Sequence, residues 1–593
     1  MGGGFRGMTV VRINIPSKAN LPDKWDEIQP HFPHPSPRIY QDDALSVAYW
    51  ALDNDDFDNI VIQAPTGIGK SPIAMTIQNK FQSAYLLTPS LGLTEQYKKD
   101  YGHRLKEVRG RSNFDCWARS GTAKGAPCWS KNSGSCKHSK REEDGGDPCD
   151  YYSQRFEAED ARLTLSNPAY LFRAVRGYTN FEQREFAIID EAHDMEGFIH
   201  DLLEVRLSAK EWQTVFGKGR FPNHLTPKDW RAELKERQEL AKTALSKAEA
   251  DLGMGTTEKQ VEAIRDAVSK LETALEILHQ PSNVHVSFEN NKWGDYLILK
   301  PIRVRDYAAE ILESVSKKRI MLSATILDIE TFLHGLGLED QKTLYINITK
   351  SPFPRENFNV HYVPCGSMSW AKRKYTLPKQ VKALDAILRQ YPNKRGVILP
   401  HSHAIRKEVV QGLIDLGHGD RIRTHDSNAR GRDEVLNEFF TSERDDLVLI
   451  STYVTQGFDF KGKLAEWLCI LKVPYLPTKD PVIAERMMQD ERAWRSVHED
   501  TPSCPYERPT KYSGDLCGAG FTCNAPCQKW YQLQTALSIV QGAGRVVRTP
   551  EDVGHLFILD GAWQRFARNS AHLIPSWFRD NIQDAPRWLK RQL

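Results

Sequence analysis

The sequence feature that most limits the possible folds is a glycine-containing loop that follows an apolar run. Residues 60–62 are Ile-Val-Ile, which predicts a buried strand of a parallel sheet. The glycines of the next segment allow a tight turn that points backbone N–H groups at phosphate oxygens, at the start of a helix. The alternative is a glycine-rich turn with a solvated lysine. The segment consists of Ala64, Pro65, Thr66, Gly67, Ile68, Gly69, Lys70 and Ser71, and Ala64 replaces the first glycine of the usual phosphate-loop pattern.

Two residues of this loop and two acidic residues form the predicted centre of a nucleotide site. In a phosphate loop, Lys70 contacts the β- and γ-phosphates and Ser71 ligates Mg²⁺. A second apolar run, residues 186–189, ends in Asp190 and Glu191. We expect Asp190 to hold Mg²⁺, directly or through water, and Glu191 to act as the general base. The alternative for the acidic pair is an ordinary helix start, where Asp and Glu are favoured.

Two arginines near the C-terminus are expected to complete the site. Arg545 and Arg548 follow Gln541, and their i,i+3 spacing puts both guanidinium groups on one face of a helix. An arginine inserted from a second domain can stabilise the charge that develops on the γ-phosphate. Surface arginines are common, so the pair gains its meaning from the segments described above.

These segments resemble the motifs of superfamily 2 helicases, and in particular the XPD/DinG branch of iron–sulfur helicases. The resemblance extends from about Arg38 to the C-terminus. It is carried by residues 64–71, 87–90 (Leu-Thr-Pro-Ser), 190–194 (Asp-Glu-Ala-His-Asp), 323–325 (Ser-Ala-Thr), 351–354 (Ser-Pro-Phe-Pro), 396–399 (Gly-Val-Ile-Leu), 455–460 (Thr-Gln-Gly-Phe-Asp-Phe), 472–477 (Lys-Val-Pro-Tyr-Leu-Pro) and 541–548 (Gln-Gly-Ala-Gly-Arg-Val-Val-Arg).

The resemblance implies further roles for particular residues. Arg38 and Gln41 correspond to the motif on the adenine side, Asp459 lies in a motif that contacts the nucleotide, and His193 and Gln541 belong to the catalytic motifs. Ser323 and Thr325 would link the acidic segment to movement along the strand.

The resemblance also implies a fold and an activity. The fold is α/β, with two doubly wound, RecA-like motor domains and ATP bound between them. The activity is that of an ATP-dependent DNA helicase that moves 5′→3′ on single-stranded DNA and unwinds forked duplexes. One alternative is an ATP-driven translocase that displaces proteins without separating strands. A degenerate ATP-gated binding protein is a different class, and the complete catalytic set argues against it.

Length and composition agree with a large multidomain enzyme. A chain of 593 residues is too long for one hydrophobic core. It contains neither an apolar stretch of 18 residues nor a signal peptide, so we expect no membrane role and a cytoplasmic monomer. The net charge of +3 does not by itself indicate a nucleic-acid partner, so any positive binding surface must be local.

Four cysteines lie between the phosphate loop and the acidic pair, in a window poor in aliphatic residues. Such a segment buries little apolar surface, so a metal that cross-links it is physically attractive. Thiolates suit zinc or an iron–sulfur cluster, and the family resemblance implies a 4Fe–4S cluster. Zinc and unrelated free thiols are the alternatives. The four residues are Cys116, Cys128, Cys136 and Cys149.

A second group of cysteines precedes the two late arginines. Cys523 and Cys527 are spaced as a chelating pair, so a structural zinc is one interpretation and reduced loop cysteines are the other. The group consists of Cys504, Cys517, Cys523 and Cys527.

Residues 227–280 are expected to form an antiparallel helical hairpin. Apolar residues recur every three or four positions, Thr257 and Gln260 form a capping box, and the break lies at 253–255. The resemblance implies that this insertion is an arch domain, and a solvated spacer is the alternative. The expected domains are the first motor domain (1–110, 161–200 and 301–350), the iron–sulfur module (111–160), the arch (201–300) and the second motor domain (351–593, with a cysteine-containing insertion near 478–530).

Overall fold

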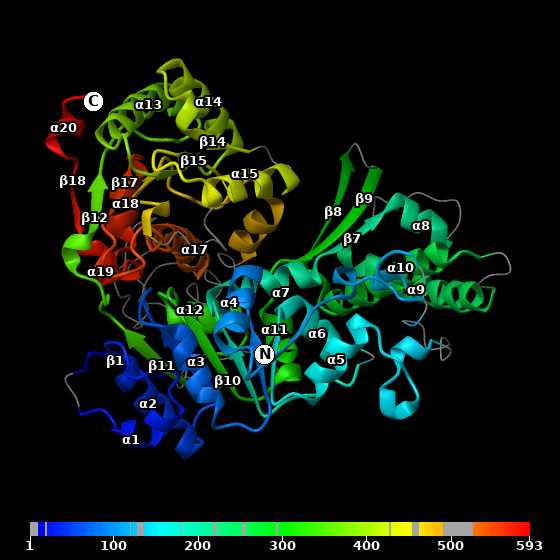
Figure 1. The fold of residues 1–593 in the computed structure, drawn as a ribbon. Coiled ribbons are helices and arrows are strands. Elements are labelled where there is room, and N and C mark those ends of the chain that lie inside the picture. The colour runs from blue at the N-terminus through cyan, green and yellow to red at the C-terminus, as the bar shows by residue number, and fades with distance from the viewer. Residues whose placement is uncertain are drawn as a thin grey trace, which may run out of the picture.

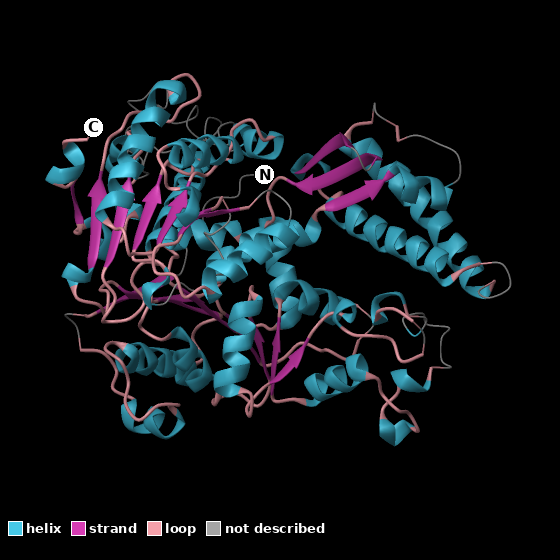
Figure 2. Ribbon diagram, turned by 45° about the horizontal axis from the view of Figure 1, so that its top comes forward, coloured by secondary structure: helices cyan, strands magenta, loops and turns pink. Residues whose placement is uncertain are grey.

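The protein contains two parallel β-sheets, each covered by helices, and a third, antiparallel sheet (Figures 1 and 2). The computed structural model describes residues 10–17, 20–118, 120–126, 128, 136–177, 179–216, 221–222, 225–251, 256–291, 294–425, 429–452, 462–489 and 526–592. Among them, no helix is both long and apolar enough to cross a bilayer.

The first lobe is built on an eight-stranded sheet in the order β1-β11-β2-β10-β6-β3-β5-β4. Its strands pair in parallel and are apolar along most of their length, as expected when helices cover both faces. Its elements are β1 (Val10–Ile15), α1 (Trp25–Ile28), α2 (Gln41–Asn54), β2 (Asn59–Gln63), α3 (Lys70–Gln78), β3 (Ala84–Leu87), α4 (Leu91–Tyr101), β4 (Lys106–Val108), α5 (Asp150–Asp160), β5 (Leu163–Ser166), α6 (Pro168–Arg176), β6 (Phe186–Ile189), α7 (Met195–Leu203), α11 (Arg305–Val315), β10 (Arg319–Ser323), α12 (Ile329–Gly335) and β11 (Thr343–Ile348).

The second lobe is built on a seven-stranded parallel sheet in the order β14-β15-β13-β16-β17-β12-β18. In Figure 1 it forms the upper left of the molecule, above the first lobe. Its elements are β12 (Phe358–Tyr362), α13 (Arg373–Gln390), β13 (Gly396–Leu399), α14 (His403–Asp415), β14 (Ile422–Thr424), α15 (Ala429–Thr441), β15 (Val448–Ile450), β16 (Trp467–Ile470), a helix over 481–489, α17 (Pro526–Ala543), β17 (Gly554–Ile558), α18 (Ala562–Asn569), α19 (Ser576–Arg579), β18 (Ile582–Asp584) and α20 (Arg587–Lys590).

An inserted lobe extends from the first lobe and forms the right of Figure 1. The predicted helical hairpin is present as two antiparallel helices, and capping boxes at Thr226 and Thr257 start them. The antiparallel sheet β7-β9-β8 beside the hairpin was not predicted from the sequence. The elements of this lobe are β7 (Val205–Ser208), α8 (Ala209–Phe216), α9 (Pro227–Ala250), α10 (Glu258–Ile277), β8 (Val284–Asn291) and β9 (Gly294–Pro301).

The inserted lobe shares a hydrophobic core with the first lobe. Trp230 and Leu234 of α9 belong to the same buried cluster as Ala187 of β6 and Met195 of α7. Trp230 is fully buried, with ring centroids 6.2 Å from Trp212 and 6.3 Å from Phe288. The hairpin is therefore anchored at its base by apolar packing.

We predict that Trp230→Ala loosens the inserted lobe. Truncating a buried tryptophan typically costs about 3–5 kcal/mol, because contacts are lost and a cavity remains. Hydrogen exchange should show faster exchange of amides in α9 and the β7–β9 sheet. The control is Leu240→Ala, which changes an exposed leucine of the same helix. Unchanged protection in the Trp230 variant would contradict the anchoring role.

Candidate nucleotide site

The phosphate loop joins β2 to α3 at the carboxyl edge of the first sheet. Gly67 and Gly69 have φ angles of +92° and +91°, a left-handed conformation that glycine adopts without steric cost. Space is a second constraint, since a side chain at Gly67 would meet the ring of Phe353 and one at Gly69 would meet the Gln41 amide. Loop conformation and close packing therefore both require glycine at these two positions.

Arg38 and Gln41 form hydrogen bonds with the backbone of the phosphate loop. The resemblance assigns both residues to the adenine side of the site. The Arg38 Nη1 atom donates to the Gly67 carbonyl at 2.8 Å, and Gln41 Nε2 donates to the Gly69 carbonyl at 3.1 Å. The Arg38 backbone N–H in turn donates to Gln41 Oε1 at 2.6 Å. These contacts fix the shape of the loop at two carbonyls.

The acidic pair lies beside the loop because β10 separates β6 from β2 by a single strand. Asp190 is 2% exposed, and its Oδ1 atom accepts a 2.9 Å hydrogen bond from the Glu191 backbone N–H. Lys70 Nζ lies 3.6 Å from Glu191 Oε1. The predicted lysine and carboxylates, 120 residues apart in the chain, therefore meet at one sheet edge.

The pKa values of the two carboxylates are shifted in opposite directions. Burial, together with the adjacent Glu191 charge, raises the pKa of Asp190 to about 6, while Lys70 acts in the opposite direction. Burial would also raise the pKa of Glu191, but nearby positive charges lower it below its usual value. In order of effect, these charges belong to Lys70, His193, Arg548 and Arg545.

The same electrostatic effect shows that the late arginines approach the acidic pair. The prediction that Arg545 and Arg548 share one face of a helix is wrong, because α17 of the second lobe ends at Ala543 and both residues lie in the turn and loop after it. Arg545 is 8% exposed, and both charges act on Glu191 in the first lobe. Gly544 lies against Thr66 of the phosphate loop. The predicted arginines of one lobe therefore face the predicted phosphate site of the other.

Two further contacts connect the predicted motifs. His193 Nδ1 lies 2.8 Å from Ser323 Oγ, and the same hydroxyl accepts a 2.9 Å hydrogen bond from the Thr325 backbone N–H. Gln541 Nε2 donates to Thr325 Oγ1 at 3.5 Å across the two lobes. Segment 323–325 therefore bridges the acidic segment and the arginine-bearing segment.

Sequence reasoning missed Tyr97, which lies at the centre of the site. This fully buried residue of α4 donates from its hydroxyl to Asp190 Oδ2 at 3.0 Å, and it also forms a hydrogen bond with Ser71. Tyr97 thus joins the two residues predicted to hold Mg²⁺. No sequence pattern around Tyr97 indicates this role, since only the packing of α4 against the sheet brings the hydroxyl there.

Phe353 is the second residue that sequence reasoning missed. Phe353 belongs to segment 351–354, which carries part of the family resemblance, and the sequence does not indicate which residue its ring contacts. In the structure the ring lies directly against Gly67. The ring belongs to the connection between the two sheets, so this connection covers the phosphate loop.

Cys116 and Cys128 lie near enough to Cys149 to act on the pKa of its thiol. Burial raises the pKa of the Cys149 thiol, while hydrogen bonds from the backbone N–H groups of Tyr152 and Tyr151 at the start of α5 act against it. Arg111 Nη1 lies 3.6 Å from Cys128 Sγ. Cys136 is joined to this region through the backbone, because His138, two residues later, accepts a 3.2 Å hydrogen bond from the Cys149 N–H.

The donor chemistry of these cysteines suits a thiolate-bound metal, but their arrangement does not form a closed site. In the part of the chain that the structure describes, no three His, Cys, Asp or Glu side chains are grouped so that they could hold a metal ion. Several predicted residues lie outside the described residues: Asp459 with segment 455–460, and Cys504, Cys517 and Cys523, together with the side chain of Cys527.

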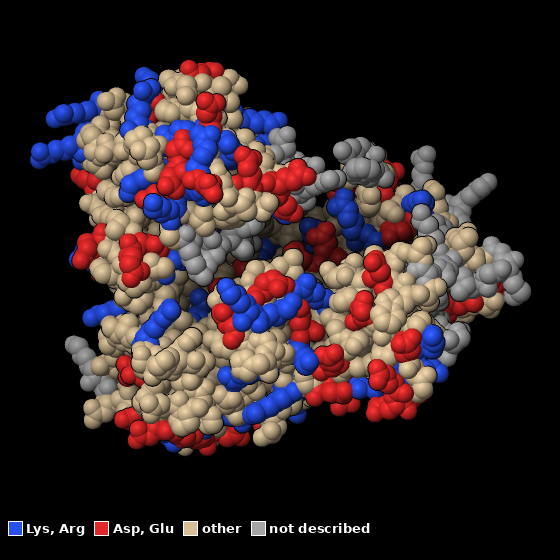
Figure 3. All heavy atoms as spheres, in the orientation of Figure 1, with Lys and Arg blue, Asp and Glu red and all other residues tan. Residues whose placement is uncertain are grey.

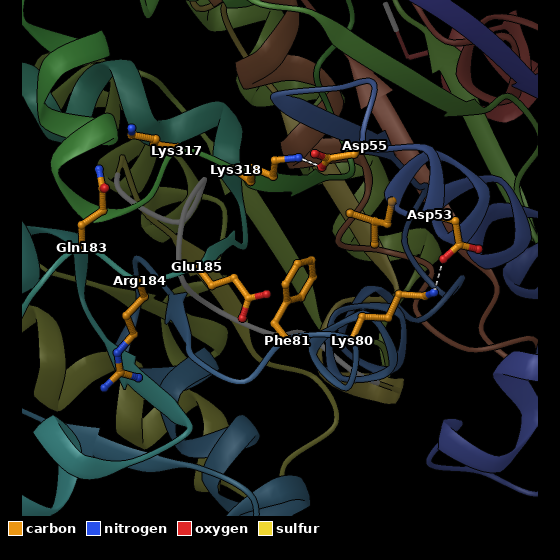
Figure 4. A pocket seen from close by; sticks show the side chains of 10 residues that line it. Asp53, Asp55, Lys80, Phe81, Gln183, Arg184, Glu185, Lys317 and Lys318 are labelled. Carbon is orange, nitrogen blue, oxygen red and sulfur yellow. Dashed lines mark hydrogen bonds and ion pairs between the residues drawn. The ribbon is translucent and has the colours of Figure 1, made fainter.

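A separate pocket lies at the opposite, amino end of the first sheet (Figure 4). Glu185 and Lys318, which line it, precede β6 and β10, whereas the nucleotide site follows these strands. Lys318 pairs with Asp55, and Lys80 pairs with Asp53 at 2.5 Å. Because the two acidic partners neutralise these lysines, we do not propose that this pocket binds phosphate.

Comparisons with known proteins agree with this geometry. Residues 34–216 match the family of the type III restriction enzyme res subunit, and residues 385–581 match the helicase C-terminal domain family. The regulator of telomere elongation helicase 1 of Mus musculus is 26% identical over 216 residues, and that of Rattus norvegicus is 31% identical over 130 residues. The mouse match covers 34% of this chain and 16% of the mouse protein, and the rat match covers 22% and 8%.

Solved structures extend the likeness over nearly the whole chain. An XPD helicase matches with a TM-score of 0.60 and 15% identity, and S. tokodaii Xpd4 matches with a TM-score of 0.52 and 16% identity. Each comparison covers 93% of this chain and 100% of the other. The fold is therefore that of the XPD structures.

The two parallel sheets, the converging motifs and the two family matches make the chain similar to superfamily 2 helicases, a class of ATP-dependent hydrolases. Within this class, the chain resembles the XPD structures in fold and the regulator of telomere elongation helicase 1 over part of its sequence. The resemblance inferred from the motifs is thereby confirmed, as is the α/β fold with two RecA-like domains.

We predict that Tyr97→Phe impairs the metal-dependent step while the protein stays folded. Removing the hydroxyl leaves Asp190 with one donor fewer, and leaving a buried polar group unsatisfied costs about 1–3 kcal/mol. ATP turnover measured against Mg²⁺ concentration should require more Mg²⁺ than the wild type does. The same substitution one turn along α4, Tyr101→Phe, is the matched control. An unchanged Mg²⁺ dependence would refute a positioning role for Tyr97.

Proposed function

We propose that this protein is an ATP-dependent DNA helicase that translocates 5′→3′ on single-stranded DNA and separates duplexes. The observation that carries the proposal is the meeting of Lys70 and Glu191 in the first lobe with the charges of Arg545 and Arg548 from the second. A site divided between two lobes couples phosphate chemistry to their relative motion, because the arginines act only when the lobes close.

The side chains of the site have separate roles in the proposed reaction. Residues 64–71 would cradle the phosphates, and Mg²⁺ held by Ser71 and Asp190 would neutralise phosphate charge. Glu191, with its lowered pKa, is a carboxylate at neutral pH and would accept a proton from the attacking water. Arg545 and Arg548 would stabilise the charge that develops on the transferred phosphoryl group.

The remaining predicted residues would support this reaction. Arg38 and Gln41 would hold the loop beside the adenine, and Asp459 would contact the nucleotide. His193 and Gln541, joined through Ser323 and Thr325, would carry the state of the phosphate site from one lobe to the other.

Binding to the DNA strand would rest on local contacts. Lys and Arg are interspersed with Asp and Glu over the face shown in Figure 3, in keeping with a net charge of +3. Contacts to phosphates are tolerant of sequence and sensitive to salt. We therefore infer that affinity for single strands falls as salt rises and depends little on base sequence.

We predict that the wild-type protein with ATP unwinds a duplex with a 5′ single-stranded tail in preference to one with a 3′ tail. Lys70→Ala should abolish DNA-stimulated ATP turnover, since the phosphate charge loses its partner, and Glu191→Gln should do so by removing the base. Unwinding is measured by strand release on a gel, and turnover by phosphate production. Lys106→Ala, which changes an exposed lysine of β4, is the control.

Three outcomes would contradict parts of this proposal. Wild-type turnover in Lys70→Ala would refute the assigned phosphate site. Preference for the 3′ tail would overturn the polarity. Displacement of streptavidin from a biotinylated single strand, without unwinding of either tailed duplex, would favour the alternative of an ATP-driven translocase.

We also propose that Cys116, Cys128, Cys136 and Cys149 hold a 4Fe–4S cluster, with zinc as the competing metal. The support is the interaction of three of these thiols and the two N–H groups that point at Cys149, which would stabilise a thiolate. No step of the proposed ATP reaction passes through this group.

We predict that anaerobically purified protein contains iron and acid-labile sulfide and absorbs near ~400 nm, as thiolate-bound clusters do. Cys116→Ser should lower the iron content, because one ligand is lost, whereas the control Ser139→Ala should not. Metal analysis that finds zinc and no iron would rule out the cluster.

The finer features of the molecule remain predictions of this proposal. The inserted lobe would serve as an arch over the translocating strand. The domain bounds would be those expected from the sequence. The second cysteine group would either hold a structural zinc or consist of reduced loop cysteines, and the protein would work as a cytoplasmic monomer.

A further inference from the structure

Three side chains outside the nucleotide site join the two lobes. Arg486, from the helix over 481–489, donates from Nη1 to Glu196 Oε1 of α7 at 2.6 Å. Its guanidinium lies 3.7 Å from the ring centroid of Trp530 on α17. The Trp530 indole N–H donates to the other oxygen of Glu196, Oε2, at 3.4 Å. We call these residues the Glu196–Arg486–Trp530 cluster.

Arg486 is the buried member of the cluster, and Glu196 and Trp530 are partly exposed. Arg486 is 8% exposed, so the Glu196 carboxylate and the face of the Trp530 ring stabilise its buried positive charge. Gly335, the last residue of α12, leaves room for this arrangement, because a side chain there would press on the Glu196 carboxylate. A planar guanidinium can stack and donate at the same time, which a lysine ammonium cannot do.

The helix that carries Arg486 also contacts the inserted lobe. Glu485 Oε2 lies 3.1 Å from His285 Nδ1 of β8. Gln489 accepts a 2.8 Å hydrogen bond from Arg303 Nη1 and donates to the Ser282 carbonyl at 3.0 Å. In Figure 1 this helix, coloured dark yellow, lies below α15 and near α7. One helix of the second lobe thus contacts the first lobe and the base of the insertion.

Both partners of Arg486 are connected to the reacting groups by short stretches of chain. Glu196 is the second residue of α7, which directly follows the segment containing Glu191. Trp530 lies 11 residues before Gln541 on α17, about 16 Å along a helix. A shift of Arg486 would therefore move the acidic segment relative to the arginines.

We propose that Arg486 is a positioning residue that sets helix α17, which leads into Arg545 and Arg548, against the acidic segment of the first lobe. The contacts of helix 481–489 with Ser282, His285 and Arg303 tie the inserted lobe to the same alignment. This inference rests on the proposed ATP turnover and adds to it a residue that touches neither nucleotide nor metal.

The test compares Arg486→Gln and Arg486→Lys with the wild-type chain in ATP turnover stimulated by single-stranded DNA. Arg486→Gln should lower kcat by about 100-fold, the effect of a misplacement of about 1 Å in a catalytic arrangement. The KM for ATP should stay nearly constant, because the phosphate loop belongs to the first lobe. Arg486→Lys keeps the charge but loses the planar contact, so its kcat should be intermediate.

A double-mutant cycle with Glu196→Gln gives a readout that general destabilisation would not produce. Because both residues act through one contact, the double variant should be no slower than the slower single variant. Arg389→Gln, which breaks an exposed pair with Asp385 on α13, is the control and should leave turnover unchanged.

Each contrary outcome has a distinct meaning. Wild-type kcat in a folded Arg486→Gln protein, or additive effects in the cycle, would overturn the positioning role and leave the proposed function intact. Loss of folding in both Arg486 variants would make the residue purely structural and would also overturn it. A wild-type protein without ATP turnover would remove both the inference and the proposed function.

Discussion

The structure depends on placing two carboxylates and a lysine at one edge of a parallel sheet. In such a sheet all strands end on the same side, so loops after β2 and β6 meet although 120 residues separate Lys70 from Asp190. Burial makes this arrangement costly for two neighbouring acids. Lys70 and the arginines favour an ionised Glu191, while burial and the Glu191 charge raise the pKa of Asp190.

Because burying these charges is costly, they require balancing charges, and these come from both lobes. The charge of the acidic pair is balanced by residues that belong to different sheets, so the site is electrostatically complete only when the lobes are apposed. The Gln541–Thr325 contact and the Glu196–Arg486–Trp530 cluster cross the same boundary. Polar contacts of this kind have preferred geometries, which would suit the opening and closing of the boundary that the proposed function requires.

The insertion is joined to the motor by two different kinds of interaction. Its base shares an apolar core with the first lobe through Trp230, and apolar packing tolerates little displacement. Its contacts with helix 481–489 are hydrogen bonds, which can break and re-form. A stiff attachment to one lobe and a polar attachment to the other would let the insertion follow the motion between them.

The sequence alone determined the strands β2 and β6, the phosphate loop, the acidic pair and the helical hairpin, because each has a local pattern of apolar spacing, glycine or capping residues. It did not indicate β1, β11 or the sheet of the inserted lobe, whose pairing depends on partners far along the chain. Only the tertiary structure revealed Tyr97, Phe353 and Arg486 as contacts of the site and of the lobe boundary. A buried tyrosine or arginine has no distinctive sequence neighbourhood, and its role follows from which side chains the packed elements bring within hydrogen-bonding distance.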